Sequence, residues 1–204
     1  MLKLNAAHIE GLQVTTRWHT RDLPPQTLAD HSCAVALLAA LIGGDTVGQE
    51  QLGQLFGLAL VHDLHETRFG DLPYPAKRYL REKGMDLDEH FRMEFWGPAP
   101  GADPYDAAPL HLRHLVDVAD ILDAALYARR HGSAELAETC RVQASKAIHD
   151  TLQGACAVRA LQVLGETGPL SLSVCPGCGG PADNGHDRCI PPSPYLCTKC
   201  QEKR

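Results

Sequence analysis

The chain has 204 residues, of which 44% are hydrophobic and 22% are charged, and its formal net charge is −6. This length holds one ordinary core plus a small module but not two large domains, and the composition is that of a globular protein rather than a disordered or fibrous one. The negative charge argues against a protein that binds long nucleic acid through clustered Lys and Arg, whereas a small anionic ligand stays compatible with it.

Neither a membrane span nor a signal peptide is expected from the sequence. No apolar run approaches the roughly 18 residues that a spanning helix needs. Residues 1–5 lack the basic, apolar and small-residue zones of a signal peptide. We therefore expect a cytoplasmic protein without membrane association. In a reducing compartment, Cys33, Cys140 and Cys156 lie in apolar helical stretches and should be small buried hydrophobes.

The first predicted helix follows Thr27, whose side chain suits an N-cap. Residues 28–38 are mostly apolar, and the pair Gly43-Gly44 ends the segment, which is typical of a buried helix. His31 then lies in the first turn of this helix.

The second predicted helix starts near Gln51 and has an apolar stripe at helical spacing. We expect it to continue through the polar cluster His62-Asp63-Leu64-His65-Glu66 and to end before Gly70. Residues 70–75 form a turn because of their Gly and Pro content, and a short helix follows over residues 76–83. Residues 98–109 are predicted to be a loop.

The strongest helical periodicity covers residues 112–126 and includes Asp120, and His131-Gly132 ends this helix. Residues 134–164 should form one or two more helices, broken near Gly154, and no strand-like alternation precedes them. The sequence therefore predicts an all-α domain over residues 1–168 and a cysteine-rich module over residues 172–204.

Two imidazoles and two carboxylates fall among these apolar helices: His31, His62, Asp63 and Asp120. Buried charges need a partner, and a His₂Asp₂ set suits Mn, Co, Fe, Ni or Zn better than Ca or Mg. Taken alone, a His-Asp pair at a helix end is more often a cap or an exposed pair. Glu66 lies one turn beyond His62, where it could transfer a proton or simply form a surface ion pair.

Five ordered sequence blocks carry a more specific signal: Arg17-Trp18, Asp30-His31-Ser32, His62-Asp63-x-x-Glu66, Gly70-Asp71-Leu72-Pro73-x-Pro75-x-Lys77 and Ala119-Asp120. Together they resemble the HD-domain superfamily of metal-dependent phosphohydrolases, and within it the bacterial 5′-deoxynucleotidases. The segments Trp18-His19-Thr20 and Pro25-Gln26-Thr27-Leu28-Ala29 are also similar to phage members that hydrolyse dATP to deoxyadenosine and triphosphate. The resemblance spans roughly residues 17–131 and implies an HD-domain helical bundle.

This resemblance implies roles for particular residues. One divalent transition metal (Co, Mn, Zn, Fe or Ni) would be held by His31, His62, Asp63 and Asp120, with Asp63 and Glu66 as catalytic groups. The substrate would be a deoxynucleotide contacted by Arg17, Trp18, Asp71, Leu72, Pro73, Tyr74 and Lys77. Arg17 offers a planar fork for phosphate oxygens and Trp18 a flat face for base or sugar. Alternatively, Arg17 forms only a surface salt bridge and Trp18 only anchors the core. Asp71 could instead be the N-cap of the helix that follows it. A homo-oligomer is also implied.

The cysteine-rich end contains two C-x-x-C pairs separated by eighteen residues: Cys175 with Cys178, and Cys197 with Cys200. This spacing predicts a zinc ribbon with one structural zinc, whose binding energy replaces the core that so short a segment lacks. Disulfide pairing is the alternative. Residues 171–204 carry four Lys or Arg against three Asp or Glu, so nucleic-acid binding is not supported.

The sequence thus predicts a metal-dependent phosphohydrolase acting on deoxynucleotides, either a 5′-deoxynucleotidase or a dNTP or dATP triphosphohydrolase. A bound divalent cation would polarise a phosphoryl oxygen and acidify a water molecule. The alternative is a zinc-ribbon module that binds nucleic acid or protein, joined to an HD domain without catalytic activity. The intact set of candidate ligands together with Glu66 favours the enzyme.

Overall fold

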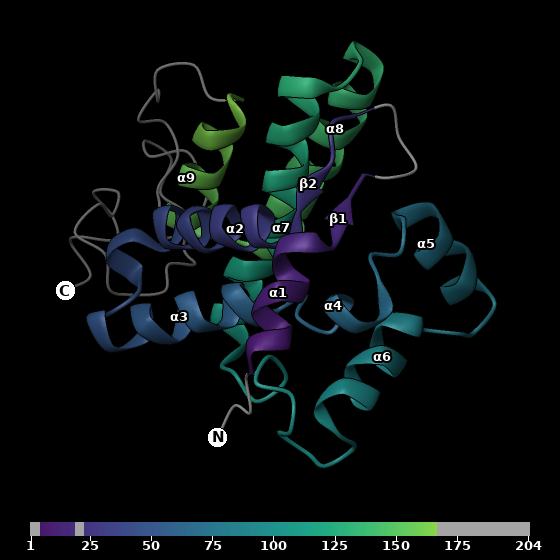
Figure 1. Cartoon of the computed structure of the whole chain (residues 1–204). Coiled ribbons are helices and arrows are strands. Elements are labelled where there is room, and N and C mark those ends of the chain that lie inside the picture. The colour runs from purple at the N-terminus through teal and green to yellow at the C-terminus, as the bar shows by residue number, and fades with distance from the viewer. Residues whose placement is uncertain (1–4, 19–22, 167–204) are drawn as a thin grey trace.

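The structure is a computed structural model that describes residues 5–18 and 23–166, without the side chain of Tyr74 (Figure 1). The predicted zinc-ribbon module, with Cys175, Cys178, Cys197 and Cys200, lies outside the described residues.

Helices dominate the described part of the chain, in agreement with the predicted all-α domain. The helices are α1 (Ala6–Val14), α2 (Leu28–Gly43), α3 (Gln49–Val61), α4 (Glu66–Phe69), α5 (Tyr74–Glu82), α6 (Leu87–Trp96), α7 (Leu110–His131), α8 (Ala134–Thr151) and α9 (Gly154–Leu164), with a short 3₁₀ turn at Gly44–Thr46. Two-residue strands β1 (Thr16–Arg17) and β2 (Gln26–Thr27) pair antiparallel.

The core forms where α2 packs against α3 and α7, while α8 and α9 cover other faces of the same bundle (Figure 1). Its largest fully buried side chains come from several helices: Leu28, Ile42, Leu55, Leu64, Leu112, Leu122 and Ile148. Burying each such side chain stabilises the fold by roughly 1.5–3 kcal/mol. Helices α4, α5 and α6 form a smaller layer at one side of the bundle (Figure 1).

Helix α2 begins and ends where the sequence predicts. The Thr27 side chain accepts a hydrogen bond from the Asp30 N–H at 3.1 Å, and Gly44 ends the helix with a φ of 45°. Residues 28–46 also have the length and mean hydropathy, 1.3, of a membrane span, so the expectation that no apolar run approaches one is wrong. The apolar face of α2 instead fills the core, with Val35, Ala39 and Ile42 fully buried. Cys33 lies on the outer face and is exposed, contrary to expectation, whereas Cys140 is buried.

The predicted helix through residues 62–66 is interrupted. Helix α3 ends at Val61, a turn carries His62 and Asp63, and Glu66 begins the short helix α4. Neighbouring residues of a regular helix point about 100° apart, because each turn holds 3.6 residues. The break lets both side chains reach one point, with His62 Nε2 3.3 Å from Asp63 Oδ2.

Two helices and the strand pair were not predicted from the sequence. Helix α1 starts with a capping box between Asn5 and His8, and α6 is capped by Asp86. Neither helix contains a buried residue, so neither has the apolar stripe from which a helix is recognised in a sequence.

Candidate metal centre

Four predicted ligands converge at the centre of the bundle. One donor atom from each of His31, His62, Asp63 and Asp120 lies within 4.8 Å of the others. His31 Nε2 is 3.1 Å from Asp120 Oδ1, 3.5 Å from Asp63 Oδ2 and 3.3 Å from His62 Nε2. The His31 side chain is fully buried and that of Asp120 is 34% exposed, so the cluster is closed on one side and open on another.

The four predicted ligands come from three parts of the bundle. His31 stands in the first turn of α2, His62 and Asp63 in the turn after α3, and Asp120 in the middle of α7. The His62 ring is oriented by a hydrogen bond of 2.7 Å between Nδ1 and the Ala59 carbonyl oxygen. That bond leaves His62 Nε2 free to face the cluster.

The charges of the cluster suit a divalent cation. Burial raises the pKa of the Asp63 carboxyl, but His62 and His31 outweigh burial and hold it well below its usual range. For Asp120 the Arg17 guanidinium and His31 outweigh burial in the same sense, so its pKa is also lowered. Both carboxylates are therefore ionised at neutral pH beside two imidazoles. This donor set fits a transition metal such as Zn, Mn or Co.

His31 holds its proton strongly while only protein groups surround it. Burial and Arg17 oppose protonation, but the carboxylates of Asp120, Asp123 and Asp63 outweigh them and raise the pKa of His31 to about 10. Since a metal binds the neutral imidazole, metal binding at this cluster must release a proton.

Arg17 and Trp18 lie beside the cluster at the end of β1. The Arg17 guanidinium contacts the His31 ring and lies 3.4 Å from Asp120 Oδ1, so it can bind an anion next to the metal. Trp18 has a φ of 68°, a positive value not shared by any other non-glycine residue in the described ranges. Its ring stacks on Tyr127 of α7, with 5.8 Å between ring centroids and 11° between planes.

Glu66 is buried at the start of α4 and is paired with Lys77 of α5. Lys77 Nζ lies 2.9 Å from Glu66 Oε1 and 3.1 Å from Asp88 Oδ1 of α6. Burial, Asp63 and Asp71 together outweigh Lys77 and raise the pKa of Glu66 to about 8. A carboxyl group with this pKa can both accept and deliver a proton near neutral pH.

The predicted substrate loop leads from α4 to α5. Asp71, Leu72 and Pro73 are partly buried there. The N-cap of α5 is Pro73, without a side-chain cap bond, so Asp71 does not have the alternative role of capping this helix. The Asp71 carboxylate contributes to the raised pKa of Glu66, so this loop lies within electrostatic reach of the cluster.

Four further polar residues belong to this region and were missed or left as accessory. Asp123 and Gln26 are buried behind His31, and His65 and Asp88 lie next to Glu66. His65 is only 3% exposed, and burial lowers its pKa. For Asp123, its position one turn after Asp120 on α7 was the available signal.

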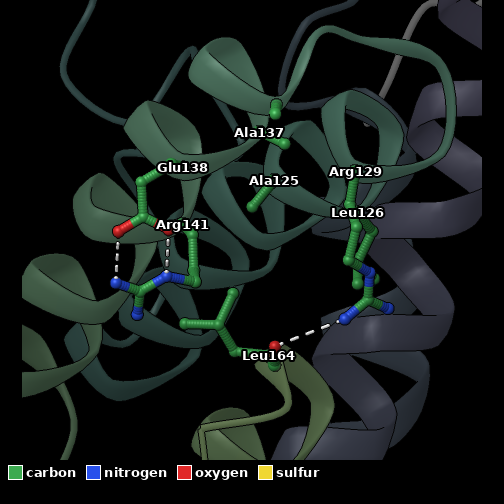
Figure 2. Close-up of a pocket in the computed structure, with 8 residues that line it drawn as sticks. Ala125, Leu126, Arg129, Ala137, Glu138, Arg141 and Leu164 are labelled. Carbon is green, nitrogen blue, oxygen red and sulfur yellow. Dashed lines mark hydrogen bonds and ion pairs between the residues drawn. The ribbon is translucent and has the colours of Figure 1, made fainter.

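A separate pocket of about 300 Å³ lies between α7, α8 and the end of α9 (Figure 2). None of the predicted site residues lines it. Arg141 pairs there with Glu138, and Arg129 donates to the Leu164 carbonyl oxygen at 3.4 Å (Figure 2). Arg129 thus links α7 to the end of α9, whereas the Arg141–Glu138 pair lies within α8.

Comparisons with known proteins identify the family and several relatives of the chain. The HD domain family profile matches residues 9–93. A dATP triphosphohydrolase of Salmonella phage PMBT28 is 30% identical over 149 residues, which cover 67% of this chain and 72% of that protein. A 5′-deoxynucleotidase of Vibrio parahaemolyticus is 36% identical over 119 residues, 53% of this chain and 60% of that protein.

A solved structure shares the fold. The cyanophage S-2L HD phosphohydrolase DatZ, bound to dA and one catalytic Zn²⁺ ion, superposes with a TM-score of 0.56 at 22% identity. The match covers 82% of this chain and 99% of DatZ.

Proposed function

The chain belongs to the HD-domain family of metal-dependent phosphohydrolases, and on that premise we propose that it hydrolyses a phosphate ester of deoxynucleotides. The observation that carries the proposal is the convergence of His31, His62, Asp63 and Asp120 within 4.8 Å, with Glu66 buried nearby. The similarity to a dATP triphosphohydrolase and a 5′-deoxynucleotidase supports the substrate class.

In this proposal His31, His62, Asp63 and Asp120 hold the metal. The chemistry that the metal supplies when bound is polarisation of a phosphoryl oxygen and acidification of water. Glu66 accepts the proton of the attacking water as the new bond to phosphorus forms. It then delivers a proton to the deoxynucleoside oxygen as the bond between that oxygen and phosphorus breaks. Lys77 holds the Glu66 carboxyl in place through its 2.9 Å contact.

Residues around the cluster would bind the substrate. Arg17 is placed to contact phosphate oxygens with its planar fork of donors. Trp18 offers its ring to the base or the sugar. The loop with Asp71, Leu72, Pro73 and Tyr74, followed by Lys77, is proposed to contact the rest of the nucleotide.

Product analysis tests this proposal. The purified protein with Co²⁺ or Mn²⁺ is incubated with the four dNMPs, the four dNTPs and the matching ribonucleotides, and products are separated by chromatography. Phosphate from several dNMPs identifies a 5′-deoxynucleotidase, and triphosphate with deoxyadenosine from dATP identifies a triphosphohydrolase. No turnover by a protein that still binds metal would contradict the proposal and favour a binding module.

Asp63→Ala should abolish turnover, because it removes a ligand and one of the charges that hold the cation. Metal content, measured by mass spectrometry of the dialysed protein, should fall in parallel. Asp150→Asn is the matched control, since this carboxylate is exposed on α8 and pairs only with Lys146 among the described residues. Full metal occupancy in Asp63→Ala would show that the cluster is not the metal site.

We also propose that residues 172–204 bind one structural zinc through Cys175, Cys178, Cys197 and Cys200. A homo-oligomer and a cytoplasmic location stay predictions. Light scattering of the purified chain measures its oligomeric state directly.

A further inference from the structure

Asp123 is a buried carboxylate that the proposed mechanism does not use. It lies on α7 one turn after Asp120, and its side chain is 9% exposed. Its Oδ2 atom is 2.7 Å from His31 Nδ1 and accepts a hydrogen bond from Gln26 Nε2 at 2.9 Å. An ionised carboxylate can only accept hydrogen bonds, so this contact requires a proton on His31 Nδ1. The Arg17 guanidinium also contacts both ring nitrogens and, as a donor, can then donate only to Nε2.

The position of that proton determines what the other ring nitrogen can do. With Nδ1 as the donor, neutral His31 has its lone pair on Nε2. Nε2 is the atom that faces Asp120 at 3.1 Å and Asp63 at 3.5 Å. A carboxylate behind a metal-binding histidine fixes its tautomer and orientation and makes it a stronger ligand. Asp123 is placed to do this for His31.

Gln26 of β2 extends this hydrogen-bond network away from the metal cluster. It is 6% exposed, and while its Nε2 donates to Asp123, its Oε1 accepts from Trp18 Nε1 at 3.1 Å. An amide has donors on one side and an acceptor on the other, so its two partners fix its orientation. The result is an unbroken hydrogen-bonded chain from His31 through Asp123 and Gln26 to Trp18.

Trp18 is held firmly at the far end of this chain. Its ring stacks on Tyr127, and its backbone has a φ of 68°. Such a backbone costs a non-glycine residue roughly 1–2 kcal/mol, so it persists only where the surroundings determine it. The indole hydrogen bond to Gln26 and the Tyr127 ring supply that constraint.

We infer that Asp123 is a positioning residue that fixes the His31 tautomer, and that Gln26 links Asp123 to Trp18 and so couples the metal cluster to the Trp18 ring. The inference rests on the proposed function, because Trp18 acts there as the surface for the base or sugar. Metal binding and nucleoside binding should then strengthen each other by the same factor, since coupling between two sites is reciprocal.

Metal affinity tests the role of Asp123. Asp123→Asn keeps the shape but removes the charge, and the Co²⁺ affinity of the full chain should fall about 10–100-fold. Calorimetric titration against the parent measures this, and Asp150→Asn is the control for loss of an exposed carboxylate. The C-terminal cysteines are the same in each variant, so metal bound there cancels in the comparison. An unchanged Co²⁺ affinity in Asp123→Asn would overturn the role.

The coupling is tested with Trp18 as the reporter. The chain has two tryptophans, so Trp96→Phe leaves Trp18 as its one indole. In this background, deoxyadenosine binding is measured from the Trp18 fluorescence. Zn²⁺ should raise the affinity for deoxyadenosine about fivefold or more. Gln26→Leu should remove this effect while Zn²⁺ affinity changes little, because Asp123 still contacts His31. The inference would be overturned if Zn²⁺ tightened deoxyadenosine binding equally in Gln26→Leu, or if it had no effect on that binding in the Trp96→Phe protein itself.

A third measurement needs no substitution at Asp123. Long-range ¹H–¹⁵N spectra of the histidine rings in the Zn²⁺-loaded full chain should show His31 protonated at Nδ1, with His31→Gln identifying the signal. A proton on Nε2 would contradict the inference even if Asp123→Asn failed to fold. This result can be told apart from failure of the proposed function. If metal and deoxyadenosine binding are coupled but no substrate is turned over, the inference holds and the proposed activity is contradicted.

Discussion

Glu66 is a buried carboxyl group whose surroundings oppose its ionisation. Its carboxyl group is enclosed at the start of α4, and Asp63 and Asp71 add to the effect of burial in raising its pKa to about 8. Lys77 opposes them from 2.9 Å and keeps the carboxyl oriented. Such a residue suits proton transfer and costs stability whenever it is ionised.

Glu66→Gln should reduce kcat by about 10²–10⁴, because the amide can neither accept nor deliver the proton. Metal content should stay unchanged, since Glu66 is not among the four converging ligands. Initial rates and metal analysis of the same preparation check both expectations. A variant that retained kcat would assign proton transfer to another group.

The same substitution should also change stability with pH. The unfolded carboxyl ionises near pH 4.5 and the folded one near pH 8, so the folded chain binds more protons between these values. Glu66 therefore makes the parent lose stability as pH rises through that window. In metal-free protein, the stability of Glu66→Gln relative to the parent should rise across the window by at least about 1 kcal/mol. Urea denaturation at several pH values measures it, and a constant difference would argue against the raised pKa.

For single residues, the sequence predicted the four members of the cluster but not the residues that contact and orient them. His31, His62, Asp63 and Asp120 fall in a recognisable order, and the structure brings them together. Asp123, Gln26 and Asp88 have no sequence pattern of their own, because their contacts depend on how β2, α2 and α7 pack and on how α6 packs against α4 and α5. A hydrogen bond between residues 92 positions apart, such as that from His31 to Asp123, is visible only after folding.

Among the elements, helices that fill the core were predictable, and of the peripheral helices α5 was predicted from the turn residues before it whereas α1 and α6 were not. Helix α7 carries nine buried residues at helical spacing and was found with nearly its observed bounds. Helices α1 and α6 bury no residue, so capping decides where they start. The turn at His62 was missed because the segment from His62 to Glu66 contains no Gly or Pro to mark a break.

Helix α6 depends on its N-cap. Asp86 accepts hydrogen bonds from the Glu89 N–H at 3.2 Å and from Arg81 Nε at 2.9 Å. Asp86→Ala should cost about 1 kcal/mol at neutral pH. It should also loosen Asp88, which contacts Lys77 beside Glu66.

The effect of Asp86→Ala should disappear in acid. Burial opposes ionisation, but the hydrogen bonds from Glu89 and Arg81 together outweigh it and lower the pKa of Asp86 in the folded state. A depressed carboxyl pKa stabilises the fold above the unfolded value of 3.8 and ceases to do so as pH falls through the folded value. Denaturation at neutral pH and below about pH 3 measures this, with the exposed Glu82→Ala as control. A pH-independent deficit would mean that the cap bond is not the cause.

For the molecule as a whole, one bundle of α2, α3, α7, α8 and α9 supports the metal cluster. The predicted zinc ribbon over residues 172–204 would be a second metal-dependent unit. In protein loaded with zinc at both sites, the double variant Cys175→Ser/Cys178→Ser should lower the zinc content from two ions per chain to one, because two ligands of a tetrahedral site are lost. Deoxynucleotide hydrolysis should persist if the bundle alone supports the active site. Metal analysis and rate assays decide both points, and unchanged zinc content would contradict the ribbon.

The wide separation of the ligands along the chain has a consequence during translation. His31, His62 and Asp63 leave the ribosome well before Asp120 and Asp123, and the apolar helix α2 emerges long before its partner α7. Until α7 appears, the nascent chain exposes a segment as hydrophobic as a membrane span and lacks its full ligand set. The newly made protein therefore needs protection from aggregation first and its metal only afterwards.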